Sequence, residues 1–378
     1  MTNLYLHIGT EKTGTTSIQE FLRMNRSALG VIGSYVPHSL GRSNHQWLPF
    51  VFSRDLTVDS FFRMQHIRTD EQRLKAQENM KNVFRDEILN THSDNWVISS
   101  EHLQSCLERR QEIVDLYDEL SNHFTTITVL VYLRNPIDTA MSAWSTRIKC
   151  GVLAKELVSP NDRRISTVCN HQRTLQIWSE VFGMENLIAR IFHAQELVGG
   201  DILSDFTSLL WPDMNIINYQ QPGRKNESLS ALGASILNQV LSLYNVKTSP
   251  TTYRHYQQIV QYIMDHTAGC GRLTVSSTSL SQYNSYFMDS NAWVQQNYFP
   301  RLFDLWPIKT DINCIKSNQD EPASAWPTTD CLYMLSSKGI QCADEIVRII
   351  ESCSILEVDV SVADLGLLEN VDLMDLVQ

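Results

Sequence analysis

The residues best suited to chemistry stand in a loop near the start of the chain that combines glycines, hydroxyls and a lysine. The segment from Leu6 to Gln19 reads LHIGTEKTGTTSIQ and joins an apolar run to an amphipathic pattern. Its two glycines permit close backbone approach, and amide N–H groups at the start of a helix bind anions. The segment therefore predicts a phosphate-binding loop. Its candidate ligand-binding residues are Lys12, Thr13, Gly14, Thr15, Thr16 and Ser17.

This loop differs from the Walker sequence G-x-x-x-x-G-K-[ST] of nucleotide triphosphatases. Gly9 and Gly14 have the Walker separation, but Thr15 stands where the Walker lysine would be. Those enzymes also place an Asp at a strand end for magnesium, whereas the apolar run at 128–133 is followed by Arg134. ATP hydrolysis is therefore disfavoured. The plain alternative is a turn that only caps a helix, but a cap needs neither a loop lysine nor four hydroxyls.

A second segment, VYLRNPIDTAMSAW at 131–144, carries an arginine and a serine eight residues apart. Arg134 leaves an apolar run, and Pro136 begins a turn or helix. On such a helix Asp138 and Ser142 share a face, because they are four residues apart. A guanidinium and a hydroxyl suit a second phosphate. Taken alone, Arg134 could equally be a structural ion-pair partner.

The elements that would position these residues follow an alternation of strands and helices. Short apolar runs indicate buried parallel strands, at Leu4–Ile8, Trp96–Ser99, Ile127–Leu133 and Leu187–Phe192. Helical patterns lie between or beside them, at Thr16–Met24, Glu71–Leu89, Ile113–Leu120 and His171–Phe182. This order predicts an α/β fold, a P-loop-like parallel sheet flanked by helices. Ligands bind at the carboxyl ends of such strands, so the polar residues after each strand should converge on one edge.

The two segments together resemble the sulfotransferases that use 3′-phosphoadenosine 5′-phosphosulfate (PAPS), in the bacterial and cyanobacterial form of that family. KTGTTS at 12–17 is similar to the family's 5′-phosphosulfate loop, and RNPxDxxxS at 134–142 to its 3′-phosphate motif. The stretch at 178–210 also resembles bacterial members. The resemblance covers roughly residues 1–240 and implies the sulfotransferase fold, with a mainly helical C-terminal extension.

The resemblance implies an enzyme that moves a sulfuryl group from PAPS to a hydroxyl or amine by in-line displacement, leaving 3′-phosphoadenosine 5′-phosphate (PAP) and needing no metal. By that resemblance Lys12 stabilises charge on the departing nucleotide, and residues 13–17 hold the 5′-phosphate. Arg134 and Ser142 hold the 3′-phosphate. Arg224 and Lys225 resemble a late basic contact to that phosphate, and a solvated basic loop is the alternative. The rival functions are a phosphate-loop kinase and a non-catalytic nucleotide-binding protein.

The acceptor must lose a proton as it attacks, and the resemblance implies a Glu or His as the base. Glu101 directly follows the segment Trp96–Ser100 that contains the second expected strand, so it should lie at the active edge. His45 lies in the polar segment RSNHQW at 42–47 and could be the base or an acceptor contact. His7 is expected to be a buried structural histidine. His102 is a further neighbour of Glu101. The catalytic candidates are therefore Lys12, Glu101 and His45, and the choice between the last two stays open.

The rest of the chain is less regular. Two domains or one large one fit a chain of 378 residues at about 150 residues per domain. We expect a PAPS-binding core over 1–240 and a helical or loop extension over 241–378, packed on the core and contributing to the acceptor site. Ser230–Tyr244 and Tyr253–His266 read as helices, whereas Thr274–Asn297, rich in Ser and Asn, reads as a loop or lid. The role of the acidic tail stays open.

Composition limits the partners. The chain has 31 Lys and Arg against 42 Asp and Glu, a net charge of −11, which disfavours nucleic acid and polyanionic glycans as ligands. No apolar run is long enough to span a membrane, and no secretory signal begins the chain. The 8 Cys are scattered with no CxxC pair, which favours reduced thiols in a cytoplasm over disulfides or a metal site.

These limits leave a small-molecule or saccharide acceptor. The 8 Trp and 13 Tyr could stack on sugars or form cation–π contacts with a cationic acceptor, although most are expected in the core. Relatives within the family sulfate guanidinium alkaloids of the saxitoxin type, so such an alkaloid is one candidate. The sequence does not choose between a saccharide and an alkaloid, or between oxygen and nitrogen, and the oligomeric state stays open.

Overall fold

The computed structural model describes residues 2–54, 59–223, 228–243, 246, 250–268 and 273–306. Its strands are β1 (Asn3–His7), β2 (Ser34–Tyr35), β3 (Asn95–Ser99), β4 (Thr126–Leu133) and β5 (Leu187–Ile191). They form one sheet in the order β2-β3-β1-β4-β5, and every pair is parallel. The predicted α/β fold with a parallel sheet is confirmed. The sequence reading missed β2, because two residues at the sheet edge are too short to show a period.

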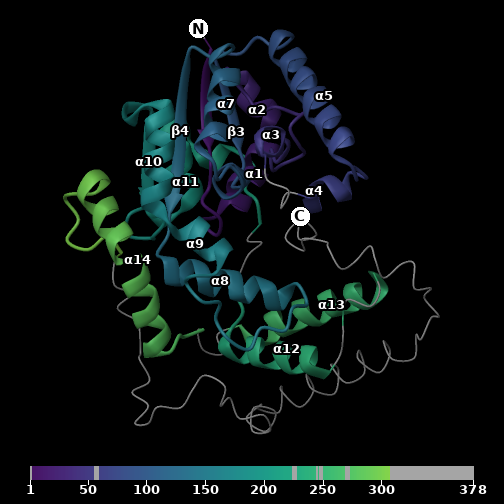
Figure 1. Cartoon of the computed structure of the whole chain (residues 1–378), viewed down its shortest axis with the longest axis vertical. Helices are drawn as coiled ribbons and strands as arrows, with labels where there is room; N and C mark the ends of the chain where they lie inside the picture. Colours follow the sequence, from purple (N-terminus) through teal and green to yellow (C-terminus); the bar gives the residue numbers. More distant parts are fainter. Residues whose placement is uncertain are drawn as a thin grey trace. The chain divides into compact units, whose positions relative to one another are not determined.

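Helices cover both faces of this sheet (Figure 1). The helices of the described chain are α1 (Thr15–Met24), α2 (Arg26–Val31), α3 (Trp47–Phe52), α4 (Asp59–Met64), α5 (Asp70–Leu89), α6 (His102–Cys106), α7 (Arg110–Ser121), α8 (Pro136–Lys149), α9 (Arg163–Cys169), α10 (His171–Phe182), α11 (Ile202–Leu210), α12 (Ala231–Leu243), α13 (Pro250–Thr267) and α14 (Ser277–Tyr298). Short 3₁₀ helices lie at Met184–Asn186, Val198–Gly200 and Ile216–Asn218.

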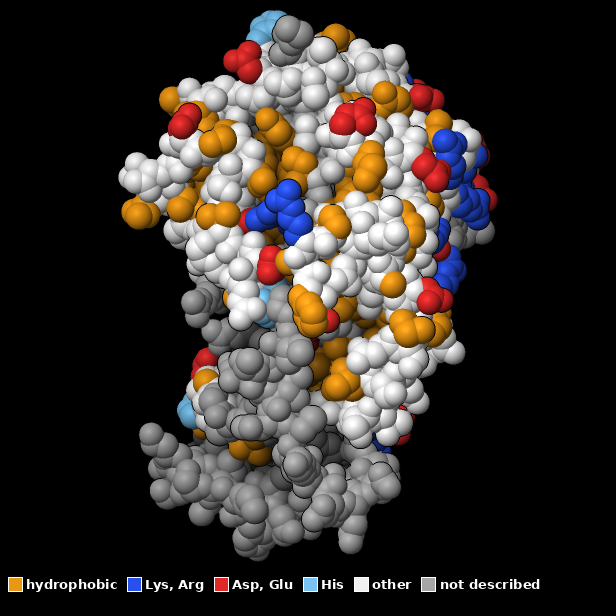
Figure 2. Space-filling view, turned by 90° about the vertical axis from the view of Figure 1, so that its left-hand side faces the viewer, with side chains coloured by type: hydrophobic (Ala, Val, Ile, Leu, Met, Phe, Trp, Pro, Cys, Tyr) orange, Lys and Arg blue, Asp and Glu red, His pale blue; other side chains and the backbone are white. Residues whose placement is uncertain are grey.

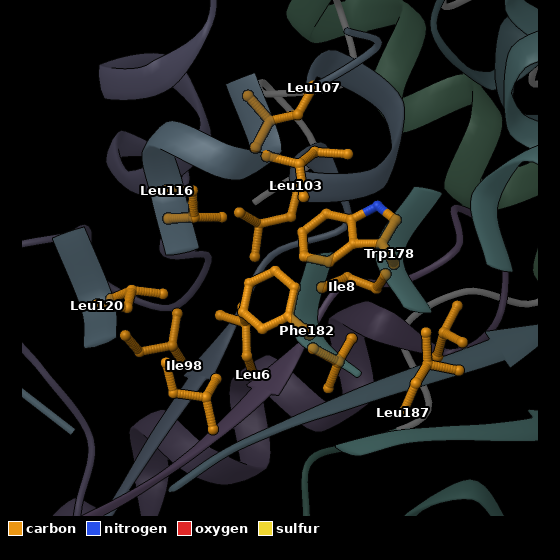
Figure 3. Packing of buried hydrophobic residues seen from close by; sticks show 14 of the residues in the cluster. Leu6, Ile8, Ile98, Leu103, Leu107, Leu116, Leu120, Trp178, Phe182 and Leu187 are labelled. Carbon is orange, nitrogen blue, oxygen red and sulfur yellow. The ribbon is translucent and has the colours of Figure 1, made fainter. Parts of the chain in front are cut away.

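One face of the sheet packs against α7 and α10. Alternate residues of β1, such as Leu4 and Leu6, point to this face and join a large buried cluster, as the two-residue period of a strand requires. Figure 3 shows Trp178 and Phe182 of α10 lying over Leu6 and Ile8. Their rings stack with centroids 5.3 Å apart. This packing fixes the sheet from which the loop after β1 emerges.

The opposite face packs against α1, α2 and α11. Val97 of β3 and Tyr132 of β4 point to this face, where they meet Phe21 of α1 and Phe206 of α11 in a second buried cluster. Helix α1 is amphipathic, and its buried side holds Ile18, Phe21 and Leu22. Because α1 is held firmly on the sheet, its first turn has a defined place at the carboxyl ends of β1, β3 and β4.

The chain divides into two compact units. The first takes Met1–Thr139, Pro160–Asn226 and Tyr283–Ile308, and the second Ala140–Ser159, Glu227–Gln282 and Lys309–Gln378. The first unit contains the sheet. In the second, α12, α13 and the end of α8 share a core of their own that includes Ile148, Leu237 and Ile263. The C-terminal part of the described chain is mainly helical, as expected. The assignment of residues 1–240 to one domain stays a prediction.

The expectation of a loop or lid over Thr274–Asn297 was wrong, because α14 runs through this segment. Its buried residues Tyr283, Phe287, Ser290 and Val294 recur every three or four positions, which is the spacing of one helix face. The many Ser and Asn residues lie around this stripe and hide it from a composition-based reading. Tertiary packing decides the helix here, against weak intrinsic propensity.

Three further points concern the charged surface, membrane-spanning helices and the acidic tail. Figure 2 shows Lys and Arg side chains along its right-hand edge with Asp and Glu side chains among them, and a further basic group nearer the centre of this face. Among the described residues, no helix combines the length and apolarity that a bilayer crossing needs. The acidic tail after 306 lies outside the described residues.

Candidate active site

The loop between β1 and α1 owes its shape to unusual backbone conformations. Gly9, Lys12 and Gly14 have φ angles of 104°, 65° and 79°, a region that residues other than glycine seldom adopt. A Cβ at Gly14 would also lie 3.2 Å from Ile202 and 3.3 Å from Phe192. Glycine is therefore required at this position on both conformational and steric grounds.

The amide end of α1 has the features of an anion site. The helix starts at Thr15, is preceded by Gly14 with no side-chain cap, and has no acidic residue in its first turn. The first N–H groups of a helix have no acceptor within that helix, and the helix dipole favours negative charge there. Thr15 is buried, whereas Thr16 and Ser17 are half-buried, as is Lys12 just before them. The structure thus gathers most of the predicted loop residues at one helix end.

The first half of the loop is fastened to β4. The amide of Thr10 donates to the carbonyl of Tyr132 at 3.0 Å, and the amide of Tyr132 donates to the carbonyl of Gly9 at 2.7 Å. The hydroxyl of Thr10 also donates to the Tyr132 carbonyl. The hydroxyl of Thr13 donates to the carbonyl of Thr10 at 2.6 Å, so its proton is used inside the loop.

Arg134, at the end of β4, contacts the loop directly. Its Nη1 donates to the carbonyl of Lys12 at 2.6 Å, and its guanidinium lies 5.5 Å from the ring centroid of Phe192. The carbonyl of Arg134 is itself bound by Nε2 of buried His171 at 2.8 Å. Burial lowers the pKa of Arg134, while the carboxylate of Asp138 opposes that shift. The two sequence motifs therefore meet in the folded chain.

Three other predicted binding residues are not placed with this group. Ser142 lies on α8, within the second compact unit. Its predicted contact with the 3′-phosphate therefore stays a prediction. Arg224 and Lys225 lie outside the described residues.

A buried carboxylate, Glu11, directly precedes Lys12 in the loop. Glu11 is 7% exposed and forms an ion pair with Arg164 of α9 at 3.1 Å. Burial alone would raise the pKa of Glu11, but the positive charges around it, Arg164 foremost, lower it. Burial alone would lower the pKa of His102, but Cys106 and two neighbouring carboxylates raise it. Glu11 is thus held as an anion beside the loop, partnered by Arg164.

Glu101 follows β3 by two residues and lies beside the phosphate loop. A Cβ added to Gly9 would stand 3.0 Å from Cα of Glu101 and 3.1 Å from its Cβ, so glycine permits this close approach. Oε2 of Glu101 accepts hydrogen bonds from Nε2 of Gln19, at 2.5 Å, and from Nδ2 of Asn44, at 3.3 Å. The side chain is half-buried. A carboxylate therefore lies within the same group as the loop and α1.

His45, the other candidate base, is fully buried. Its Nδ1 accepts a hydrogen bond from the amide of Ser99 at 3.0 Å, and its own amide donates to the carbonyl of Ser99 at 3.1 Å. Burial, and to a lesser degree the charge of Arg26, lowers the pKa of His45 to about 3. Its accepting nitrogen is therefore occupied, and the imidazole stays neutral and fastens the segment 43–45 to β3.

His7 is buried as expected. A hydrogen bond of 2.8 Å joins its Nδ1 to the hydroxyl of Ser99, and burial lowers its pKa to about 3. Ser99 thus contacts both buried histidines. Within the residues that the structure describes, no three His, Cys, Asp or Glu side chains are grouped so as to hold a metal ion.

The sequence reading missed the residues that support this site. Gln19, Asn44 and Thr10 make hydrogen bonds to Glu101 or within the loop, and Phe192 lies against Arg134. A signal existed for Asn44, because it lies in the polar segment that drew attention to His45. Gln19 read as an ordinary helix residue, since nothing in the sequence relates it to a residue 82 positions away.

Comparison with known proteins adds little. No protein-family model matches the chain, and no curated protein matches it significantly. A crystal structure described as a sulfotransferase from Alicyclobacillus acidocaldarius matches with a TM-score of 0.39 and 13% identity, over 78% of this chain and 95% of that one. A likeness at that level supports no conclusion about the activity of this chain.

Proposed function

We propose that this protein is a sulfotransferase that moves a sulfuryl group from PAPS to a hydroxyl or amine of a small molecule or saccharide. The observation that carries the proposal is the contact between its two motifs. Arg134 donates to the carbonyl of Lys12 at 2.6 Å, so a guanidinium, an ammonium-bearing loop and a helix start occur together. Such a group suits a ligand with more than one phosphate or sulfate.

The residues present fit the nucleotide. The first turn of α1 has neither a side-chain cap nor an acidic residue, so nothing on the helix itself competes with an anion there. We assign the 5′-phosphate to the loop amides and to Thr15, Thr16 and Ser17. We assign the 3′-phosphate to Arg134, and on the sequence resemblance alone we add Ser142, Arg224 and Lys225. When bound, PAPS supplies a sulfuryl group attached to a good leaving group.

The chain's own side chains would then supply charge and a base. The acceptor atom forms a bond to sulfur as the bond from sulfur to the bridging oxygen breaks, and that oxygen keeps the electron pair. Lys12 stabilises the negative charge that develops there. Glu101 takes the proton of the acceptor. We favour Glu101 over His45, because Nδ1 of His45 is occupied by the Ser99 amide and its pKa is lowered to about 3.

The acceptor class is proposed from the net charge of the chain. A net charge of −11 favours a neutral or cationic acceptor over a polyanion, and a guanidinium alkaloid remains a candidate beside saccharides. Cys106 and Cys169 of the described chain are free thiols, which supports a reaction in a reducing cytoplasm.

The first test is a thermal-shift titration with PAP, set beside ATP with magnesium. A ligand at 100 times its dissociation constant stabilises the native state by about 2.7 kcal/mol, a shift of a few degrees. Stabilisation by PAP alone is expected. Stabilisation by ATP and magnesium alone would overturn the proposal in favour of a kinase.

Binding does not prove transfer, so the second test follows radiolabelled sulfate from PAPS into a panel of acceptors. The panel contains saccharides, simple amines and a guanidinium alkaloid, with water as the base line. Labelled product is expected with at least one hydroxyl or amine. PAP binding without transfer to any member or to water would support a non-catalytic nucleotide-binding protein instead.

A further inference from the structure

The carboxylate of Glu101 is held by one oxygen only. Gln19 and Asn44 both donate to Oε2, at 2.5 Å and 3.3 Å. Neither donor is exchanged easily with water, because Gln19 is 2% exposed and Asn44 is 2% exposed. Within the described residues, Oε1 has no hydrogen-bond partner of its own. The two oxygens therefore differ in their surroundings. Two donors hold Oε2, and Oε1 is left for a further hydrogen bond.

Each donor is itself tightly fixed. Gln19 lies on the buried side of α1, five residues after Gly14, so it belongs to the helix whose start forms the anion site. Asn44 precedes His45, and the two hydrogen bonds between His45 and Ser99 fasten that segment to the end of β3. Gly9 allows the backbone of Glu101 to touch the loop. The phosphate helix and the strand end thus hold Glu101 from two sides.

We propose that Gln19 and Asn44 are positioning residues that orient Glu101 so that Oε1 takes the proton of the acceptor. This inference rests on the proposed function, and it adds two residues and the choice of one oxygen. A base that is free to rotate spends little time in the reactive arrangement, whereas two donors on Oε2 fix the plane of the carboxylate. Gln19 also joins the base to the helix proposed to bind the nucleotide. The position of the base is therefore fixed relative to the nucleotide.

The central test is the variant Gln19→Leu, which keeps the side-chain volume and removes the donor. A displacement of about 1 Å in a reacting group can cost about 100-fold in rate. We expect kcat for sulfuryl transfer from PAPS to fall by about 10- to 100-fold. The probe acceptor is the fastest member of the panel, or water if none exceeds it. The dissociation constant of PAP should change by less than about twofold, because the loop and Arg134 are untouched.

A matched control separates positioning from general packing. Gln77 of α5 is also buried, at 7% exposure, and its Nε2 donates to the carbonyls of Phe50 and Ser53. Gln77→Leu therefore removes a buried glutamine donor without touching Glu101. Its kcat should stay close to that of the unchanged protein once both are measured below their unfolding temperatures. Asn44→Ala provides a second positioning variant should Gln19→Leu fail to fold.

A double-mutant cycle shows whether the effect passes through Glu101. Gln19→Leu should cause no further loss in a Glu101→Gln background. Full kcat in Gln19→Leu and Asn44→Ala, with Glu101→Gln inactive, would overturn the inference and leave the proposed function intact. Equal losses of kcat and PAP binding would overturn it as well, since they indicate a structural role. Full transfer by Glu101→Gln would remove both the inference and the base assigned above, while PAP binding alone without transfer would remove the proposed function.

Discussion

The loop after β1 and the turn after β3 lie in contact at Gly9 and Glu101, yet they are built by different means. The loop depends on the main chain, with positive φ angles at Lys12 and Gly14 and amides that begin a helix. The turn depends on side chains, with Glu101 held by Gln19 and Asn44. A main-chain site depends on conformation and tolerates many side chains, whereas a side-chain site depends on the identity of each partner.

The largest effect should come from Lys12, because one substitution there separates the contribution of the side-chain charge from that of the backbone conformation. Lys12→Gly removes the ammonium but suits the φ of 65° better than lysine does. Turnover of PAPS should fall by about 1,000-fold, as when a group that stabilises developing charge is lost, while stability should not decrease. Transfer rate and the free energy of unfolding are the two measurements. Unchanged turnover would refute the role given to Lys12.

Arg134 joins the two regions, and its loss should act on binding. Arg134→Ala removes a guanidinium that donates to the loop and would contact a phosphate. Charge-assisted hydrogen bonds contribute about 1.5–3 kcal/mol, so the dissociation constant of PAP should rise by about 10- to 100-fold. Titration calorimetry measures it, with Arg134→Lys as the charge-preserving control. A loss of turnover with unchanged PAP affinity would contradict this assignment.

The buried histidines His7, His45 and His171 predict a dependence of stability on pH. Burial lowers the pKa of His7 and His45 to about 3 and that of His171 to about 4, whereas an unfolded histidine titrates near 6.5. The unfolded chain therefore binds protons first, so stability is fully present above pH 6.5 and is lost as the pH falls toward these values. Each histidine contributes a slope of about 1.4 kcal/mol per pH unit.

The variant His45→Asn tests that account, because an Asn oxygen can still accept from the amide of Ser99. Its free energy of unfolding should fall less steeply between pH 6 and pH 4.5, by about one histidine's slope of 1.4 kcal/mol per pH unit. Denaturant titrations at several pH values give the slope. An identical slope in both proteins would mean that His45 is protonated in the folded state.

The smallest effect concerns the backbone of the loop. Gly14→Ala places a Cβ at a φ of 79° and 3.2 Å from Ile202, so stability should fall by about 1–2 kcal/mol. Gly30 of α2 is the matched control, because a Cβ there meets nothing within 4 Å. Gly30→Ala should leave stability unchanged or raise it by about 0.5–1 kcal/mol. Equal effects of the two changes would show that the loop conformation is not specific.

The contrast between the two regions also explains what sequence reading could achieve. Gly9, Lys12 and Gly14 lie within six positions of the sequence. The glycines indicate an unusual loop conformation, and the lysine indicates its positive charge. Strands β1, β3, β4 and β5 were equally visible as apolar runs, whereas β2 was not. The partners of Glu101 lie on other elements, and hydrogen bonds between distant side chains leave no local pattern. Helix α14 was hidden for a related reason, since its buried stripe is diluted by Ser and Asn.

The hydrogen bonds that join Gly9 and Thr10 to Tyr132 extend the sheet past the last residue of β1. This half of the loop is therefore already ordered before any ligand arrives. Ligand binding then costs little conformational entropy of the chain. Such a cost opposes binding when a flexible loop must become ordered. A nucleotide should accordingly associate at a rate governed by encounter, and differences in its affinity among variants should appear as differences in residence time.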